Sequence, residues 1–338
     1  MMLIVALNHY YDNDIQFKPS AKIAFRAIQL IAEFVSEKIG VSAPVSAFSQ
    51  VRQREFMKWS IARFAHSAGT ISRNLSVASA AFYFGRKQQI IRDGFGNEIE
   101  VTLLDSAPHV VTQAREVARL TDIPDSTPRD WLPSFEEFGV FIDRIDVRQE
   151  NLFRFVMMAL NTWSRPEAII DLRTDRQIDW AFGVVDLNPP GRRQTKKYRP
   201  KIKLTENLAD WFRHWDASAP MMWDGKPVTT MKRTFKRHAV ASGHTNFTQD
   251  TIRHFMATYV RQATPRVSKE QRDIWLGHND QRTAGWYEHR DPEFLDDARR
   301  ATEAVIDELQ RHTKRPLSAR KLRAKSSLSV VTANQGGK

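Results

Sequence analysis

A helix start near residue 165 carries an arginine that helix formation does not explain. The string Ser164-Arg165-Pro166-Glu167 predicts a helix with Ser164 as its N-cap, Glu167 as the returning half of a capping box, and Pro166 in the first turn. Arg165 would then lie in that first turn, where the helix dipole disfavours a cation by roughly 0.3–1 kcal/mol. Helix stability therefore does not account for Arg165.

The same arrangement recurs around residue 250. Apolar residues at positions 252, 255, 256 and 259 predict a helix capped by Asp250, which places Arg253 in its first turn as well. Free backbone N–H groups at a helix start, together with a guanidinium, form a site for a phosphate. An ordinary buried ion pair at each arginine is the alternative. Two arginines placed in this way favour a shared anion.

A strongly basic run lies between the two arginines. Residues 191–204, GRRQTKKYRPKIKL, hold seven lysines and arginines and no acid. The run follows a Pro-Pro-Gly turn signal and ends in an alternating stretch, so it predicts a β-hairpin that presents basic side chains. A solvated hairpin is the alternative to a phosphate-binding one.

Two further residues of useful chemistry follow Arg253. Residues 268–271 predict a capping box, Gly277 is expected to end that helix in the left-handed conformation, and His278 comes directly after it. Tyr287 lies nine residues beyond the histidine, beside a tryptophan. A histidine at a helix end and a tyrosine next to a tryptophan are most often structural, so neither indicates catalysis by itself.

Composition points to an anionic partner. The chain has 338 residues, 41% of them apolar, no cysteine, and a net charge of +12. Eight of these positive charges lie in residues 311–338, which contain no acid and could be a solvated tail or an arm that contacts phosphates. The absence of cysteine excludes disulfides, thiolate metal sites and a cysteine nucleophile. Nucleic acid is the first candidate partner.

Other classes are disfavoured by what the sequence lacks. No Walker loop, dinucleotide fingerprint or clear metal-ligand cluster occurs, so we expect neither a cofactor nor a metal. The apolar start, MMLIVAL, is too short to span a bilayer and has no basic region before it, so we expect neither secretion nor membrane insertion. We expect a cytoplasmic, nucleoid-associated protein.

Hydrophobic periodicity divides the chain into four parts. Residues 21–40 and 51–86 show helical spacing, which predicts a helical N-terminal domain over residues 1–95. A polar, proline-containing stretch makes residues 96–134 a connecting segment and linker. Residues 135–310 are expected to form a second domain, followed by a basic and flexible tail over residues 311–338.

Taken in order, these residues resemble those of the tyrosine recombinase, or phage integrase, family. The strings that carry the resemblance are SRPEAIIDLR around Arg165, RRQTKKYR around Lys196, DTIRHFMATYV around Arg253, WLGH ending at His278, and GWYEH holding Tyr287. They cover roughly residues 150–300. Upstream, residues 69–86 more weakly resemble the helical core-binding domain that clamps DNA.

The resemblance implies a role for each of these residues. Tyr287 would attack a DNA phosphodiester, forming a 3′-phosphotyrosine and freeing a 5′-hydroxyl without metal or ATP. Arg165 and Arg253 would stabilise the charge that grows on the phosphate oxygens, which guanidinium groups suit well. Lys196 would protonate the leaving oxygen and His278 would assist by hydrogen bonding.

Two positions leave the assignment open. Asp250 stands where the family most often has histidine, and it could accept a proton or simply cap the helix. Lys197 is adjacent to Lys196, so either lysine could be the proton donor. Further contacts to DNA are expected from three other arginines of the basic run, Arg192, Arg193 and Arg199.

We therefore expect a mainly α-helical protein with a small antiparallel β-sheet: a helical core-binding domain followed by a tyrosine-recombinase catalytic domain. The expected function is site-specific DNA recombination by the integrase of a phage or other mobile element, acting on double-stranded DNA. The resemblance implies a homotetramer linked by exchange of C-terminal segments, with residues 293–310 as the candidate. The alternatives are relaxation of DNA like a type IB topoisomerase, a DNA-binding protein that has lost cleavage, and an RNA-binding protein.

Overall fold

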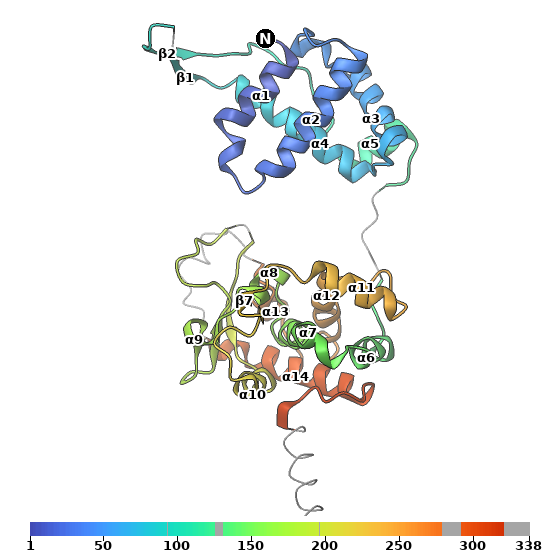
Figure 1. Cartoon of the computed structure of the whole chain (residues 1–338), viewed down its shortest axis with the longest axis vertical. Helices are drawn as coiled ribbons and strands as arrows, with labels where there is room; N and C mark the ends of the chain where they lie inside the picture. The colour runs from blue at the N-terminus through green and yellow to red at the C-terminus, as the bar shows by residue number, and fades with distance from the viewer. Residues whose placement is uncertain (93, 126–130, 196, 279–291, 321–338) are drawn as a thin grey trace, which may run out of the picture. The chain divides into compact units, whose positions relative to one another are not determined.

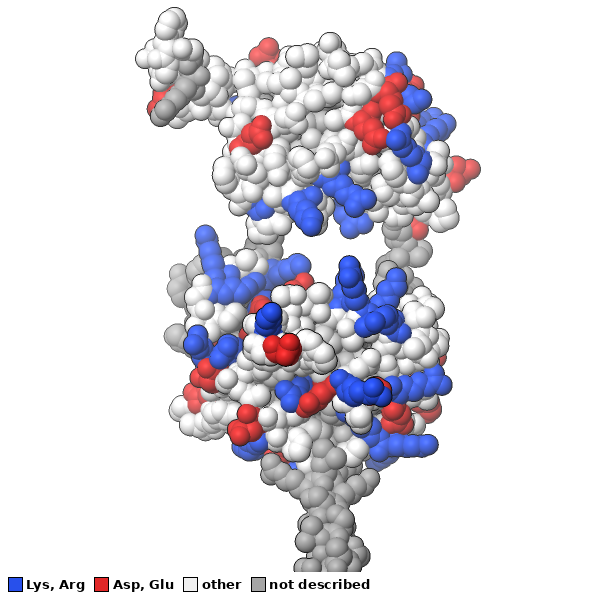
Figure 2. Space-filling model, in the orientation of Figure 1, with Lys and Arg blue, Asp and Glu red and all other residues white. Residues whose placement is uncertain are grey.

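The computed structural model divides the chain into two compact units, Met1–Arg129 (unit 1) and Asp130–Lys338 (unit 2) (Figure 1). It describes residues 1–92, 94–125, 131–195, 197–278 and 292–320. Charged side chains of both signs lie over the face of each unit that Figure 2 shows. Every helix among the described residues is too short or too polar to cross a membrane.

Unit 1 is mainly helical. Its elements are α1 (Leu3–Asn13), α2 (Ala21–Lys38), α3 (Gln50–Phe64), α4 (Ala68–Gly85), β1 (Gln89–Arg92), β2 (Glu98–Val101) and α5 (Ala114–Thr121), with short 3₁₀ turns at Ile15–Phe17 and Val45–Ala47. The helices predicted over 21–40 and 51–86 are confirmed, the second as two helices. Strands β1 and β2 pair antiparallel.

Aromatic rings fill the core of unit 1. Phe34, Phe48, Phe56 and Phe82 are buried, and three of their pairs meet edge to face. The chain after β2 returns to this core, because the buried amide of Gln53 donates to the carbonyls of Phe48 and His109 and accepts from the Val111 N–H. Helix α5 packs on α4, so this part of the segment expected to connect the domains lies in the core of unit 1.

Unit 2 surrounds one largely buried helix, α7. Its elements are α6 (Phe135–Asp143), α7 (Glu150–Thr162), α8 (Pro166–Ile170), α9 (Thr174–Gln177), β3 (Ile178–Asp179), β4 (Val184–Asp186), β5 (Lys201–Lys203), α10 (Glu206–Trp215), β6 (Met222–Trp223), β7 (Lys226–Pro227), α11 (Lys232–Ala241), α12 (Gln249–Tyr259), α13 (Lys269–Trp275) and α14 (Asp296–Arg311), with 3₁₀ turns at Val147–Gln149 and Pro292–Leu295. The fold class, mainly helical with small antiparallel sheets, is confirmed.

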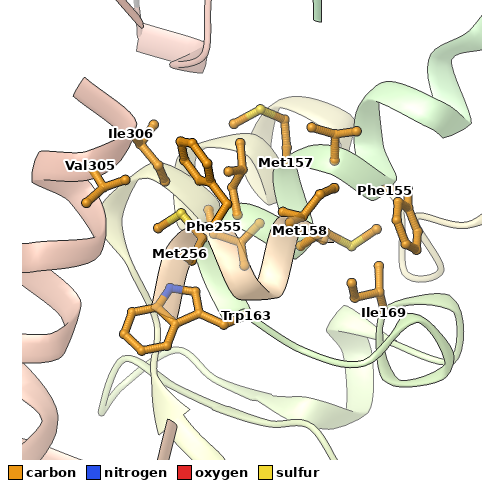
Figure 3. Close-up of a cluster of buried hydrophobic side chains, with 14 of the residues drawn as sticks. Phe155, Met157, Met158, Trp163, Ile169, Phe255, Met256, Val305 and Ile306 are labelled. Carbon is orange, nitrogen blue, oxygen red and sulfur yellow. The ribbon is translucent and has the colours of Figure 1, made fainter. Parts of the chain in front are cut away.

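Helix α7 is buried on almost all sides, as its composition predicts. Figure 3 shows Phe155, Met157 and Met158 of α7 among side chains of α8, α12 and α14. Methionine and phenylalanine fill the irregular spaces between helices that cross at different angles. Both ends of α7 are therefore fixed, and its C-terminal end at Trp163 adjoins the site described below.

The basic run connects two antiparallel strands, so the predicted hairpin is confirmed. The sheet order is β3-β4-β5, with Val185 opposite Ile202 on the buried face. The Leu187 N–H donates to the Pro200 carbonyl, which closes the base of the connection. The described basic residues from Arg192 to Arg199 lie in this connection, which we call the basic loop (residues 188–199).

Helix α14 packs within its own unit, against α6, α7, α12 and α13. The chain after it also folds back onto unit 2, although the sequence favoured a flexible tail from residue 311. Leu317 is buried, and its carbonyl accepts hydrogen bonds from Asn207 and Trp211. Asp143 accepts the backbone N–H groups of Lys314 and Arg315. Residues 321–338 lie outside the described part of the chain.

Candidate active site

Arg165 stands at the turn between α7 and α8. Trp163 ends α7 with a φ of 50°, which redirects the chain. Arg165 is the N-cap of α8 (φ −67°, ψ 148°), an extended geometry that a residue before proline favours. Ser164 was predicted to be the cap, and that prediction is wrong: its hydroxyl donates to the Thr162 carbonyl, 3.4 Å away. Pro166 begins the helix, so the extended residue before it takes the capping position.

Arg253 lies in the second turn of α12, not in its first. The helix begins two residues earlier than predicted, because Thr248 is the N-cap and forms a capping box with Thr251. The predicted cap, Asp250, is instead an exposed residue of the first turn, where the helix dipole favours its negative charge. The capping role assigned to Asp250 is therefore wrong.

The guanidinium of Arg253 joins the ends of two other helices. It donates to the carbonyl of Trp163, at 2.9 Å, and to the carbonyl of Leu276, at 2.6 Å. These carbonyls belong to the C-terminal ends of α7 and α13, where the helices leave acceptors unused. Arg165 donates to the Tyr198 carbonyl of the basic loop, at 3.3 Å. Within the described residues, neither arginine has a carboxylate at ion-pair distance.

The positive charges of Arg165 and Arg253 are therefore held close together in a partly buried site. Burial, reinforced by the charge of Arg165 and opposed by Asp250, lowers the pKa of Arg253 to about 10. Arg253 still carries its charge at neutral pH. An anion bound between Arg165 and Arg253 would relieve their repulsion, and it would meet donors whose positions are already fixed.

His278 is positioned by the end of α13. Gly277 adopts a φ of 65°, as predicted, and the His278 N–H donates to the Asp273 carbonyl at 2.8 Å. The imidazole Nε2 lies 3.3 Å from Arg253, and Nδ1 lies 3.4 Å from the Asp273 carboxylate. Because a guanidinium can only donate, Nε2 is the acceptor in this arrangement and Nδ1 carries the proton.

A pocket of about 170 Å³ opens between these elements. Its lining includes Arg165, Arg253, Arg192, Lys197 and Arg199, with a single acid among the side chains that line it. A pocket of this size with this many cationic side chains suits a phosphate rather than a metal ion or an apolar ligand. The basic loop and the two helix-borne arginines thus face one cavity.

Gly277 is also where α13 approaches the basic loop most tightly. A Cβ at this position would lie 2.6 Å from the Tyr198 carbonyl oxygen and 3.0 Å from a side-chain carbon of Pro200. The glycine is therefore required twice, once by its positive φ and once by lack of space. Its second role brings the loop next to Arg253 and His278.

Comparisons with known proteins agree with this architecture. No protein-family model matches the sequence, and no curated protein matches it either. Solved structures do match. The Tn1549 transposon integrase in complex with circular intermediate DNA has a TM-score of 0.62 at 16% identity, over 90% of this chain and 99% of that one. A lambda integrase dimer bound to a COC′ core site has a TM-score of 0.56 at 15% identity, over 86% and 99%.

This chain has the tyrosine recombinase fold. A lambda integrase tetramer bound to a Holliday junction also matches, with a TM-score of 0.56 at 14% identity, over 86% of this chain and 80% of that one. At such low identity the match concerns the fold alone. The fold predicted from the order of the motifs is thus confirmed.

Within the tyrosine recombinase fold, the structure gathers part of the predicted site. Arg165, Arg253 and His278 lie together, and Lys197 lines the same pocket. Two predicted residues, Lys196 and Tyr287, lie outside the described residues.

The three other arginines of the basic loop differ in their surroundings. Arg193 is exposed, and Arg192 donates to the side chain of Asn188 at 2.6 Å. Arg199 is held by Asp171, with 2.9 Å between its guanidinium and the carboxylate, and its side chain is only 11% exposed. Arg199 thus serves partly to anchor the loop to α8.

Several residues of the site gave no usable signal in the sequence. Asp273 contacts His278 across one helical turn, and Asn188 and Gln194 hold the basic loop through their amides. The acceptors of Arg253 are main-chain carbonyls, which cannot be predicted from the type of residue that carries them. Only the tertiary arrangement reveals these contacts.

Proposed function

We propose that this chain is a site-specific DNA recombinase, the integrase of a phage or other mobile element. It would cut and rejoin double-stranded DNA through a 3′-phosphotyrosine intermediate with Tyr287 as the nucleophile. The single observation that carries the proposal is the pocket where Arg165 and Arg253 meet without a carboxylate partner among the described residues.

The chemistry of the pocket suits attack on a phosphodiester. As the phosphorus becomes five-coordinate, negative charge grows on its non-bridging oxygens, and each fixed donor contributes on the order of 3–4 kcal/mol. A tyrosine with a pKa near 10 is a weak nucleophile at neutral pH and needs a strongly positive site. Arg165 and Arg253 supply that field. A lysine of the basic loop, Lys196 or Lys197, would give a proton to the 5′-oxygen as the P–O bond breaks.

A second basic surface supports DNA as the substrate. Helix α11 exposes Lys232, Arg233, Lys236 and Arg237, and no acid lies in the helix. In Figure 1, α11 and α12 lie at the same end of unit 2 as α8, and Figure 2 shows lysines and arginines gathered there. A duplex whose phosphate enters the pocket would find further positive charge along this end.

The similar structures support a DNA substrate and an assembly of several copies. The Tn1549 and lambda integrases are bound to DNA in their structures, and one lambda structure is a tetramer on a Holliday junction. We therefore propose a tetramer on two duplexes for this chain as well. Helix α14, the segment expected to exchange between copies, packs within its own unit in the single chain.

One observation favours a second function, DNA binding without cleavage. Asp250 occupies the position where a histidine is usual, and it is exposed at the start of α12. A carboxylate near the phosphate would repel it, whereas the two arginines would still bind DNA.

Trapping the covalent intermediate distinguishes the two functions. The full chain is incubated with nicked suicide duplexes that carry candidate attachment sites from the DNA flanking the gene. We expect a protein–DNA adduct that Tyr287→Phe abolishes while DNA binding persists. Tyr259→Phe is the matched control, because Tyr259 packs against Phe135 and Phe255. No adduct on any duplex would favour the binding protein.

The same variants identify the nucleophile and the reaction. If Tyr287→Phe still formed an adduct, Tyr198, which lines the pocket, would be the next tyrosine to test. Paired duplex substrates then separate recombination from relaxation: recombinant junctions support the proposal, and relaxation alone would indicate a topoisomerase-like enzyme.

A further inference from the structure

The basic loop is closed by an amide rather than by a strand ladder. Gln194 donates from Nε2 to the Arg199 carbonyl, at 2.7 Å, and its Oε1 accepts the Arg199 N–H, at 3.1 Å. One exposed side chain therefore satisfies both main-chain groups of a residue five positions later. The turn between them carries the lysine pair of the sequence, Lys196 and Lys197.

The C-terminal side of this turn, at Tyr198 and Arg199, is attached to the pocket. The Arg199 guanidinium binds the Asp171 carboxylate of α8, at 2.9 Å, and the Tyr198 carbonyl accepts from Arg165, at 3.3 Å. Gly277 approaches the same carbonyl closely. The N-terminal side of the turn has fewer anchors, among them Arg192, which reaches Thr195 and Asn188. Gln194 thus joins the side of the turn with fewer anchors to the side that Arg199 and Tyr198 attach to the pocket.

We infer that Gln194 is a positioning residue, which holds the loop lysine where it can protonate the leaving 5′-oxygen. The inference rests on the proposed function. Lys197, the described lysine of the turn, lines the pocket with Arg165 and Arg253, and its N–H donates to Thr195, at 3.2 Å. Gln194 itself does not line the pocket and acts through the turn that it closes; its Oε1 also accepts from the Arg192 guanidinium, at 3.5 Å.

In the step concerned, the Tyr287 phenol gives up its proton to solvent, its oxygen forms a bond to phosphorus, and the bond from phosphorus to O5′ breaks. The lysine ammonium gives its proton to O5′. When sulfur replaces O5′, the leaving group is a thiolate, which is far less basic than an alkoxide and departs without a proton. A defect confined to the lysine therefore disappears with a 5′-bridging phosphorothiolate, whereas a defect in phosphate binding or folding does not.

The test compares two suicide duplexes, one with the ordinary phosphodiester and one with the 5′-bridging phosphorothiolate. The variant is Gln194→Met, which keeps the length of the side chain and removes its hydrogen bonds to Arg199 and Arg192. The control is Gln262→Met, at another exposed glutamine of unit 2. General acid catalysis contributes about 10²–10⁴-fold, so partial misplacement of the lysine should slow cleavage about 10- to 100-fold.

We expect Gln194→Met to be slow on the ordinary duplex and as fast as the unmodified chain on the phosphorothiolate, with Gln262→Met unaffected on both. Equal slowing on both duplexes, or no slowing on either, would overturn the inference alone. If the unmodified chain formed no adduct on either duplex, the proposed function would fail and the inference with it.

Discussion

The two sides of the candidate site are built in different ways. On one side, the partly buried Arg253 is held by the carbonyls at the ends of α7 and α13, next to the hydrophobic core of unit 2. On the other side, the basic loop is held by exposed amides, those of Asn188 and Gln194. Under the proposed function, the donors that match the growing charge on phosphorus are held at helices, whereas the proposed proton donor is carried on a loop that a few polar contacts shape.

The largest loss of adduct formation should come from replacing Arg253. Arg253→Ala removes a donor pair from the phosphate and leaves the Trp163 and Leu276 carbonyls without a partner. We expect adduct formation to fall by about a thousandfold or more. We also expect the free energy of unfolding to fall by about 1–3 kcal/mol, as measured by urea denaturation.

Arg165→Ala serves as the matched comparison. Its only described acceptor is the Tyr198 carbonyl, at 3.3 Å, so adduct formation should fall steeply with little change in the free energy of unfolding. Equal destabilisation by the two variants would contradict the claim that Arg253, unlike Arg165, also helps to hold the fold together.

The next largest loss of activity should come from replacing a lysine of the basic loop. One of Lys196→Ala and Lys197→Ala should slow cleavage about a hundredfold on an ordinary phosphodiester, because a general acid is lost. A 5′-bridging phosphorothiolate should restore the rate of that variant only. If both variants stayed slow with the sulfur leaving group, the lysines would be binding phosphate rather than donating a proton.

Gly277→Ala tests the close contact between the end of α13 and the basic loop. The added Cβ would lie 2.6 Å from the Tyr198 carbonyl oxygen, at a backbone φ of 65°. We expect a loss of about 1–3 kcal/mol in the free energy of unfolding and slower adduct formation. Gly243→Ala is a suitable control for strain alone, because its φ of 88° is also positive but nothing lies within 4 Å of the added atom. A loss no larger than that of the control would mean that the close approach is unimportant.

The smallest effect concerns Asp273. Burial raises the pKa of this carboxyl, but hydrogen bonds from Lys269 and His278 outweigh it, so the net pKa is lowered. The carboxylate therefore stabilises the folded state above the ordinary aspartate pKa, near 3.9, and loses this contribution as the pH falls through its lower folded value. Its side chain is about a third exposed, so we expect less than about 1 kcal/mol.

Urea denaturation as a function of pH measures this contribution. Asp273→Asn should flatten the acid limb of the stability curve slightly, relative to the unmodified chain. An unchanged acid limb would show that the carboxylate contributes nothing measurable to folding.

The sequence singled out Arg165 and Arg253, which lie together in the structure, but it predicted less well how they are held. Arg165 and Arg253 were found because a cation near a helix start is unfavourable, yet both capping assignments missed by a residue or two. Pro166 moved the first cap from Ser164 to Arg165, and a threonine pair moved the second from Asp250 to Thr248. Local patterns indicate that a helix begins, and the neighbouring backbone decides where.

Other features could not be predicted because they depend on residues far apart in the chain. The carbonyls that hold Arg253 lie 90 and 23 positions away from it. The second constraint on Gly277 comes from Tyr198, on a different element. The amide contacts of Gln194 bridge only five residues, but a glutamine in a basic run has many possible partners.

The central claim is that Arg165 and Arg253 bind the non-bridging oxygens of the phosphate that is cut. The most direct measurement is adduct formation by the unmodified chain and by Arg165→Ala on two suicide duplexes, one with the ordinary scissile phosphate and one with an uncharged methylphosphonate there. The account predicts a large loss for Arg165→Ala on the phosphate and little loss on the methylphosphonate, where one charged oxygen is absent. An equal loss on both duplexes would contradict it.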